Sequence, residues 1–465
     1  MISLVESLIT PVHFLLLAIS PLVLLSLCIQ QPVGVIQKRN LDIFSPVFLV
    51  GGALFLGTTL RTFFLVFDDP EPEKIQRLMG NHLPEEILLP GLIAINLGLA
   101  AWTLGYLLVR HSKAPDQRRL LAISTSHYFL AMSLSLLVGV TLVALYLRHV
   151  DFFDDISNLG FSAKRFVEIE GIASTAGHLR IGGDLLSGLA IIQACYFYVI
   201  DRRKRQACLL VFIILLAVIT PVIASVRGEL VYLAFSIIII RHYGYKKIPV
   251  STIFLVLLLS FLLLGFMETI RQRTNTVDEE VSFTPGQVID TVIYTPHFIG
   301  IGKTSSVIAK VPEQVDYLYG KSYAMTLIAP IPRVLWKDKP IVRVGKFVGK
   351  KIYERQNKSG VPPGLIGEAF LNYGWPGVIV IAFIFGGISK LAYVALIVKR
   401  QPGDVLRLGL YSIIAITIID ILVTDFTGNV MRMTRYVVPF LLFMWLVGRH
   451  KLTGNNNAPS YSGAS

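Results

Sequence analysis

Long apolar runs constrain the fold more than any other feature of this sequence. Runs of about 20 apolar residues recur along the chain, which is the length that a helix needs to cross roughly 30 Å of hydrocarbon. A membrane strand needs only about 10 residues of alternating pattern, which is not what these runs show. With 54% hydrophobic and 16% charged residues, the chain holds more apolar surface than a soluble core requires. The sequence therefore predicts an all-α polytopic membrane protein.

Eleven of these runs are candidate transmembrane helices, and an undetected twelfth would change only the side of the N-terminus. They are residues 10–29, 44–67, 87–109, 121–147, 181–200, 207–225, 228–240, 250–268, 374–398, 408–426 and 436–449. Basic residues gather in alternate connections, namely 30–43, 110–120, 201–206, 241–249 and 399–407. The positive-inside rule places these connections in the cytoplasm and residues 68–86, 148–180, 225–229, 269–373 and 427–435 outside.

The domain organisation follows from this topology. An N-terminal bundle of about eight spans covers residues 1–268, and a large external loop carrying short interfacial helices covers 269–373. Further spans occupy 374–449, and the polar tail 450–465 is predicted to be a disordered cytoplasmic segment. The three cysteines of the chain show no metal-binding spacing. The N-terminus lacks the basic region of a cleaved signal peptide.

The large external loop is basic. Residues 269–365 contain fourteen Lys and Arg against eight Asp and Glu, which is unusual for a segment outside the membrane. Such a surface beside a bilayer attracts anions, of which lipid phosphates, diphosphates and acidic sugars are the obvious examples. A loop whose charges only keep it soluble is the alternative.

Within this loop, the stretch IPRVLWKDKP (331–340) combines fixed backbone with a cation and an aromatic ring. Its prolines restrict the backbone, so Arg333 and Trp336 lose little entropy on binding a ligand. A guanidinium matches two phosphate oxygens at once, and a tryptophan can anchor the loop at the membrane interface. A proline-rich structural turn would also explain the pattern.

Further ionisable residues lie where burial in the membrane is costly. They are Arg227 and Glu229 in the SVRGE turn, Asp420 and Asp425 near the outer end of the tenth span, and Arg432 and Arg435 on one helical face. Charges at membrane depth line a cavity or pair with each other, and they are functional-site candidates by default. Structural pairs of Arg227 with Glu229, or of Arg432 with Asp425, are the alternative.

The stretch GLIGEAFLNYGWPG (364–377) enters the ninth span from outside. Glu368 and Asn372 are four residues apart and share one helical face, and Tyr373 follows at headgroup level. Glu368 can act as a general base, orient a hydroxyl or pair with an arginine. The acidic pairs at 68–69 and 151–155 lack a third ligand at metal-site spacing, so no metal site is predicted. GIGKTSS (300–306) lacks the first glycine of a phosphate-binding loop, and no nucleotide or nucleic acid is expected as a partner.

Two motifs together resemble a known family. PRxLWxxKP (332–340) in a large outer loop and GExxxNYGxxG (367–377) at the start of a late span look like the Wzy-type oligosaccharide repeat-unit polymerases, which make bacterial O-antigen and exopolysaccharide. The motifs cover about 50 residues, and the hydropathy plan agrees over most of the chain. The resemblance implies a metal-independent and cofactor-free glycosyltransferase of the bacterial inner membrane, with its large loop in the periplasm.

In that reading, the enzyme transfers a growing glycan from undecaprenyl diphosphate to the non-reducing end of another lipid-linked unit. Glu368 and Arg333 are the expected catalytic residues. The expected substrate contacts are Arg227, Arg432, Arg435, Trp336, Asn372 and Tyr373. Membrane lipid, a chain-length regulator and a flippase of the same pathway are the implied partners. An O-antigen ligase and a lipid-linked oligosaccharide flippase remain open as alternatives.

Overall fold

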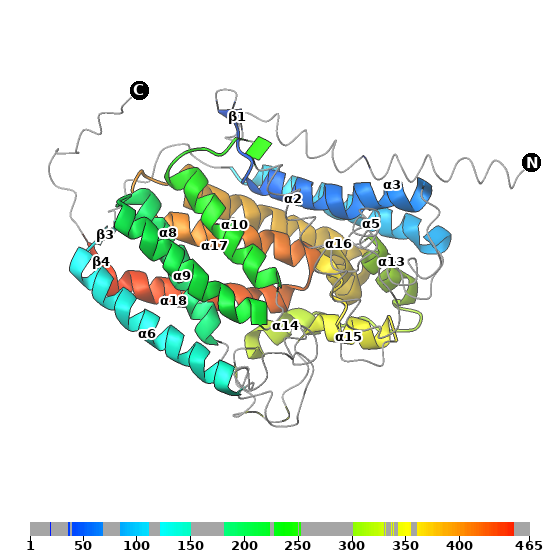
Figure 1. Ribbon diagram of the computed structural model, residues 1–465. Helices are drawn as coiled ribbons and strands as arrows, with labels where there is room; N and C mark the ends of the chain where they lie inside the picture. Colours follow the sequence, from blue (N-terminus) through cyan, green and yellow to red (C-terminus); the bar gives the residue numbers. More distant parts are fainter. Residues whose placement is uncertain are drawn as a thin grey trace, which may run out of the picture.

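A computed structural model describes residues 36–37, 40–67, 84–110, 121–149, 181–223, 227–249, 301–329, 343–354 and 360–450, together with a few isolated positions. The described part of the chain is a helical bundle with two short antiparallel strand pairs, β1 with β2 and β3 with β4 (Figure 1). The N-terminal elements are β1 (Ile36–Gln37), β2 (Asn40–Leu41), α2 (Pro46–Leu54), the π-helix η1 (Phe55–Thr59), α3 (Leu60–Phe67), α5 (Pro84–Leu108), β3 (Leu121–Ile123) and α6 (Thr125–His149). The central and C-terminal elements are α8 (Ile181–Val199), α9 (Lys204–Ile223), α10 (Arg227–Gly244), α13 (Ile301–Lys310), α14 (Lys321–Ile328), α15 (Val344–Lys351), α16 (Gly364–Tyr393), η4 (Val394–Val398), α17 (Val405–Val423), α18 (Phe426–Val447) and β4 (Gly448–His450).

Within the part of the chain that the structure describes, eight helical segments are long and apolar enough to cross a membrane, which confirms a polytopic all-α membrane fold. They are Pro46–Phe64, Leu88–Leu108, Thr125–Arg148, Ile181–Val199, Lys204–Val222, Gly364–Val398, Val405–Val423 and Phe426–Val447. The predicted spans 10–29 and 250–268 lie outside the described residues. The predicted span 228–240 is helical as part of α10, whose charges at both ends keep it out of the set of apolar spans.

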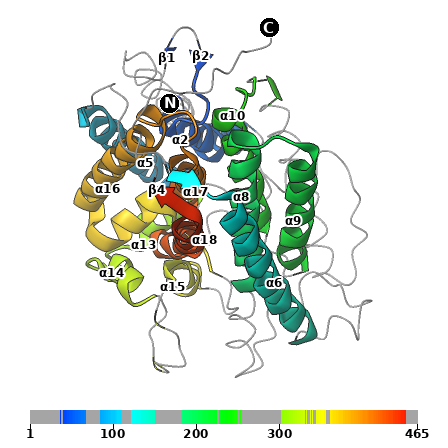
Figure 2. The same ribbon diagram turned by 90° about the vertical axis from the view of Figure 1, so that its left-hand side faces the viewer.

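The bundle has two hydrophobic cores. One is formed mainly by α2, α5, α13, α15 and α16, and the other by α6, α8, α9, α10, α17 and α18. In Figure 2, α5, α13 and α16 lie on one side and α6, α8 and α9 on the other, with α17 and α18 between them. Glycines allow α5 and α16 to approach closely. A Cβ on Gly105 would lie 2.0 Å from the Phe383 carbonyl oxygen, and a Cβ on Gly386 would lie 2.0 Å from the Trp102 carbonyl oxygen.

The basic turns meet at one end of the bundle. Arg400, after η4, donates to the Tyr243 carbonyl at 2.7 Å, and Arg202 lies 4.4 Å from the ring centre of Tyr245. The pairing of β3 with β4 closes the same end, and α13, α14 and α15 lie toward the other (Figure 1). The positive-inside rule predicts that the basic end faces the cytoplasm, and we call the end with α13–α15 the outer end.

Two predicted boundaries need correction at the outer end. Residues 427–435, predicted to be a loop, form the first turns of α18, because Asp425 caps this helix by accepting from the Gly428 N–H at 2.6 Å. Arg432 and Arg435 therefore lie inside a span. Within the predicted loop 269–373, α13 is buried between α5 and α16, and residues 364–373 already belong to α16.

Candidate functional site

The first half of α16 carries Glu368 and Asn372 into a closed polar cluster. Glu368 is fully buried. Its Oε1 accepts from the Ser322 hydroxyl at 2.7 Å, and its Oε2 accepts from the Phe426 backbone N–H at 2.8 Å. The side chain thus joins α16 to α14 and to the N-terminus of α18. A carboxylate at a helix N-terminus is also favoured by the helix dipole.

Asn372 completes this arrangement one turn further along. It is also fully buried, and its Nδ2 donates to the Ser322 hydroxyl at 2.7 Å while its Oδ1 accepts from the Gly320 N–H at 2.9 Å. Thr427 donates to the Ser322 carbonyl at 2.8 Å. We call Glu368, Asn372, Ser322, Gly320, Phe426 and Thr427 the Glu368 cluster. Its hydrogen bonds from Ser322, Phe426 and Thr427 tie α14, α16 and α18 together, and Asn372 also donates to the Glu368 carbonyl within α16 at 2.7 Å.

A break in α16 explains why the segment before α14 docks here. Gly374 adopts a left-handed φ of 62°, so the helix is interrupted and its last carbonyls lose their partners within α16. The N–H groups of Leu318 and Tyr319 replace those partners, reaching the carbonyls of Leu371 and Asn372 at 2.9 and 3.1 Å. The GExxxNYG stretch therefore builds a binding surface for residues 318–322.

Tyr323 adds a buried phenol to this region. Its ring meets Phe426 edge-on with centroids 5.4 Å apart, and its hydroxyl has no hydrogen-bond partner among the described residues. Burial, together with the nearby Glu368, raises the pKa of the Tyr323 phenol. The neutral phenol is the form that this site holds.

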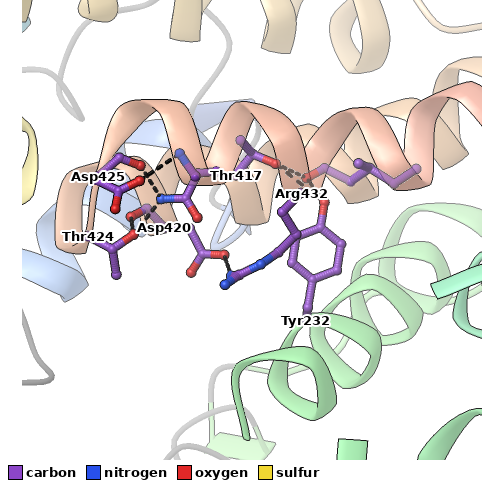
Figure 3. Close-up of polar contacts among 9 residues, drawn as sticks. Tyr232, Thr417, Asp420, Thr424, Asp425 and Arg432 are labelled. Carbon is purple, nitrogen blue, oxygen red and sulfur yellow. Dashed lines mark hydrogen bonds and ion pairs between the residues drawn. The ribbon is translucent and has the colours of Figure 1, made fainter. Parts of the chain in front are cut away.

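The second polar cluster lies about 9 Å further along α18, six residues after Phe426. Arg432 Nη1 donates to Asp420 Oδ2 at 2.7 Å, and Arg435 Nη1 donates to Asp184 Oδ2 at 2.6 Å. The first ion pair is partly open, since both side chains are 25% exposed. In the second, Arg435 is 35% exposed but Asp184 only 4%. Figure 3 shows Arg432 reaching across to Asp420.

Tyrosines line the inner side of these ion pairs. Tyr232 and Tyr436 stack with centroids 4.6 Å apart, and the Tyr232 hydroxyl donates to the Ile413 carbonyl of α17 at 2.9 Å (Figure 3). Glu229, buried at the start of α10, is a charged neighbour of Arg432. We call Asp184, Glu229, Asp420, Arg432 and Arg435, with these two tyrosines, the Arg432 cluster. It brings together α8, α10, α17 and α18.

The predicted site residues differ in where the structure places them. Glu368 with Asn372, and Arg432 with Arg435, form the two clusters, which share α18. Tyr373 and Trp336 present exposed rings, at 45% and 39%. Arg333 and the side chain of Arg227 lie outside the described residues.

One sequence interpretation changes with this geometry, and two residues are new. Arg432 pairs with Asp420, and not with Asp425, whose carboxylate caps α18. Asp184 and Ser322 were not predicted. An acid within the apolar run 181–200 could have revealed Asp184, because ionisable residues at membrane depth usually have a partner. Nothing in the sequence around Ser322 distinguishes it from an ordinary loop serine.

One family model matches this chain. It is described as a Domain of unknown function (DUF8712), and it matches residues 103–395. The chain belongs to the DUF8712 family. The match contains Glu368, Asn372 and Asp184, and it ends before Asp420, Arg432 and Arg435. No curated protein and no solved structure matches the chain. Among the described residues of this DUF8712 protein, no group of three or more His, Cys, Asp or Glu side chains could hold a metal ion.

Proposed function

We propose that this protein is a membrane glycosyltransferase that polymerises oligosaccharide repeat units carried on undecaprenyl diphosphate. The observation that carries the proposal is the pair Arg432 and Arg435, two partly exposed guanidiniums held inside the outer half of a membrane bundle. Charges at this depth are costly, and proteins keep them mainly where they line a site or pathway. The proposed location is the outer face of the bacterial inner membrane.

The chemistry of the reaction explains why arginines belong there. The acceptor hydroxyl oxygen bonds to the anomeric carbon and its proton is released to water, and the bond from that carbon to the diphosphate breaks with its electron pair going to the diphosphate. Negative charge therefore grows on the leaving group. Preorganised guanidiniums stabilise such charge in the manner of an oxyanion hole, and their planar forks match phosphate oxygens.

The position of the arginines fits a lipid-linked substrate. Arg432 lies about two turns below the start of α18, so its charge lies near the level where a membrane lipid places its phosphates. Trp336 and Tyr373 expose rings at the outer end that can stack on sugar faces. Arg333 and Arg227 are the further cations that we assign to the diphosphate.

Glu368 takes a different role in this proposal from the one the motif suggests. Both of its carboxylate oxygens already accept hydrogen bonds, and the side chain is fully buried. In this arrangement Glu368 does not reach an acceptor hydroxyl. We assign it to holding α14 and α18 in register, which positions the arginines of α18.

The test is polymerisation by the purified protein. Wild type in a chelator is incubated with lipid-diphosphate-linked repeat units, and a ladder of glycan lengths on a gel is the expected result. The ladder should vanish in Arg432→Ala and persist in Arg205→Ala, which changes an exposed arginine at the basic end. Transfer onto lipid A without a ladder would identify a ligase, and movement of lipid-linked units without any new glycosidic bond would identify a flippase.

A further inference from the structure

The two ion pairs of the Arg432 cluster differ in how firmly their acids are held. Asp184 is buried, and it has contacts besides Arg435. Opening that pair would leave a buried charge uncompensated, which is strongly unfavourable. Asp420 is partly exposed, and Arg432 is the only described residue that donates to its carboxylate. The pair of Asp420 with Arg432 is therefore the one that a ligand can open.

Arg432 also has unused capacity for an anion. A guanidinium has five N–H donors, and the described residues engage one of them, through Nη1. Gly228, the second residue of α10, lies beside it, and a Cβ there would be 3.9 Å from Nη1 and 4.0 Å from Nη2. The α10 N-terminus contributes positive potential at this point. These groups favour an anion in the space beside the guanidinium, and buried Glu229 in the first turn of α10 opposes one.

We propose that Asp420 occupies the position of the substrate's diphosphate in the resting protein, and that the diphosphate displaces it from Arg432. This inference rests on the proposed function. Arg435 keeps Asp184 and offers its remaining N–H donors to the same ligand. Asp420 swings toward water when the ligand binds, and it returns when the ligand leaves.

The charge of the product gives this exchange a purpose. Cleavage replaces the sugar ester by an ionisable oxygen, so the leaving diphosphate carries about one more negative charge than the donor lipid. Arginines without a competitor would retain that product more tightly than the substrate. A tethered carboxylate competes at an effective concentration in the millimolar range, so it promotes product release.

The experiment measures binding of prenyl diphosphates to the whole protein in lipid nanodiscs. Farnesyl diphosphate is the probe, and farnesyl phosphate and inorganic pyrophosphate separate recognition of the lipid from recognition of a free anion. The variants are Asp420→Asn, which removes the competing charge, and Asp420→Glu, which keeps it. Asp425→Asn is the matched control, because it changes an acid five residues away that caps α18 and that forms no ion pair with an arginine among the described residues.

We expect Asp420→Asn to bind farnesyl diphosphate about tenfold more tightly than wild type, because the competing charge is gone. Asp420→Glu and Asp425→Asn should stay close to the wild-type affinity. In polymerisation, Asp420→Asn should complete a first turnover at the wild-type rate and then slow, because release of the product becomes limiting.

Equal or weaker binding by Asp420→Asn, in protein with a wild-type melting temperature, would overturn the inference and make Asp420 an orienting residue. The proposed function would survive that result if the wild-type protein still formed a glycan ladder. If Asp420→Asn does not fold, Asp420→Ser, which also removes the competing charge, takes its place. Tighter binding of farnesyl diphosphate by this variant would support exchange, and an equal or lower affinity would count against it. Tighter binding of pyrophosphate but not of farnesyl diphosphate would overturn the assignment to a lipid ligand.

Discussion

The Glu368 cluster and the Arg432 cluster use the same helix in opposite ways. At the start of α18, Glu368 has no exposure, and each carboxylate oxygen holds a donor. Six residues later, Arg432 is one quarter exposed and makes a single hydrogen bond. A buried and satisfied group is costly to disturb, whereas a partly hydrated ion pair contributes little to stability. The first cluster can therefore fix the fold, and the second can exchange partners.

The difference between the two clusters predicts that substitution of Glu368 has the largest effect on stability. Glu368→Ala leaves the Ser322 hydroxyl and the Phe426 N–H without their acceptor, so we expect the free energy of unfolding to fall by about 4 kcal/mol. Thermal unfolding in detergent measures this. Glu313→Ala, an exposed acid of the same outer segment, is the control and should leave the melting temperature unchanged. If Glu368→Ala had the wild-type melting temperature, the Glu368 cluster would have no structural role.

The Arg432 cluster should show the reverse pattern, with loss of activity and little loss of stability. Arg432→Ala removes one donor from the developing negative charge, so we expect polymerisation to fall about a hundredfold, equivalent to roughly 3 kcal/mol. Arg432→Lys should be nearly as poor, because an ammonium cannot form the bidentate contact. Rates of glycan extension, measured beside melting temperatures, test this. Wild-type extension by the lysine variant would show that only net charge matters at this site.

Ser322 tests whether the first cluster acts as a unit. Its hydroxyl donates to Glu368 and accepts from Asn372. Ser322→Ala should therefore lower the unfolding free energy by about 2 kcal/mol, because two buried polar groups lose a partner. Ser389→Ala is the matched control, since this buried serine of α16 bonds only to the Phe385 carbonyl one turn earlier, an interaction that contributes little.

Ser322→Ala also distinguishes two possible roles of Glu368, namely positioning α18 and transferring a proton. If Glu368 positions α18, Ser322→Ala should lower the polymerisation rate together with Glu368→Gln, with the pH profile unchanged in both. If Glu368 acts as a base, Glu368→Gln should lose the acidic limb of the profile, where the rate rises as the carboxyl group loses its proton, while Ser322→Ala retains most of its activity. The second outcome would restore the role that the motif suggested.

Part of this arrangement could be predicted from the sequence. Apolar length fixes the spans, and the spacing of Glu368 and Asn372 places them on one face, because both follow from local helix geometry. The partners of these residues come from segments about 50 residues away, and no local signal encodes such pairing. Residues 427–435 were misjudged as a loop because their two arginines lower the local hydropathy, and only the acids on α8 and α17 reveal that the helix continues.

The smallest predicted effect is at Asp425, and it sharpens the distinction between the acids at the outer end. Asn is as good an N-cap as Asp, so Asp425→Asn should change the unfolding free energy by only a few tenths of a kcal/mol. Asp425→Ala, which removes the acceptor for the Gly428 N–H, should cost about 1 kcal/mol. Melting temperatures and glycan ladders of both variants provide the measurement. A large loss of activity in the stable Asp425→Asn protein would mean that the negative charge of Asp425 acts on the substrate, and the exchange site would then extend from Asp420 to the α18 cap.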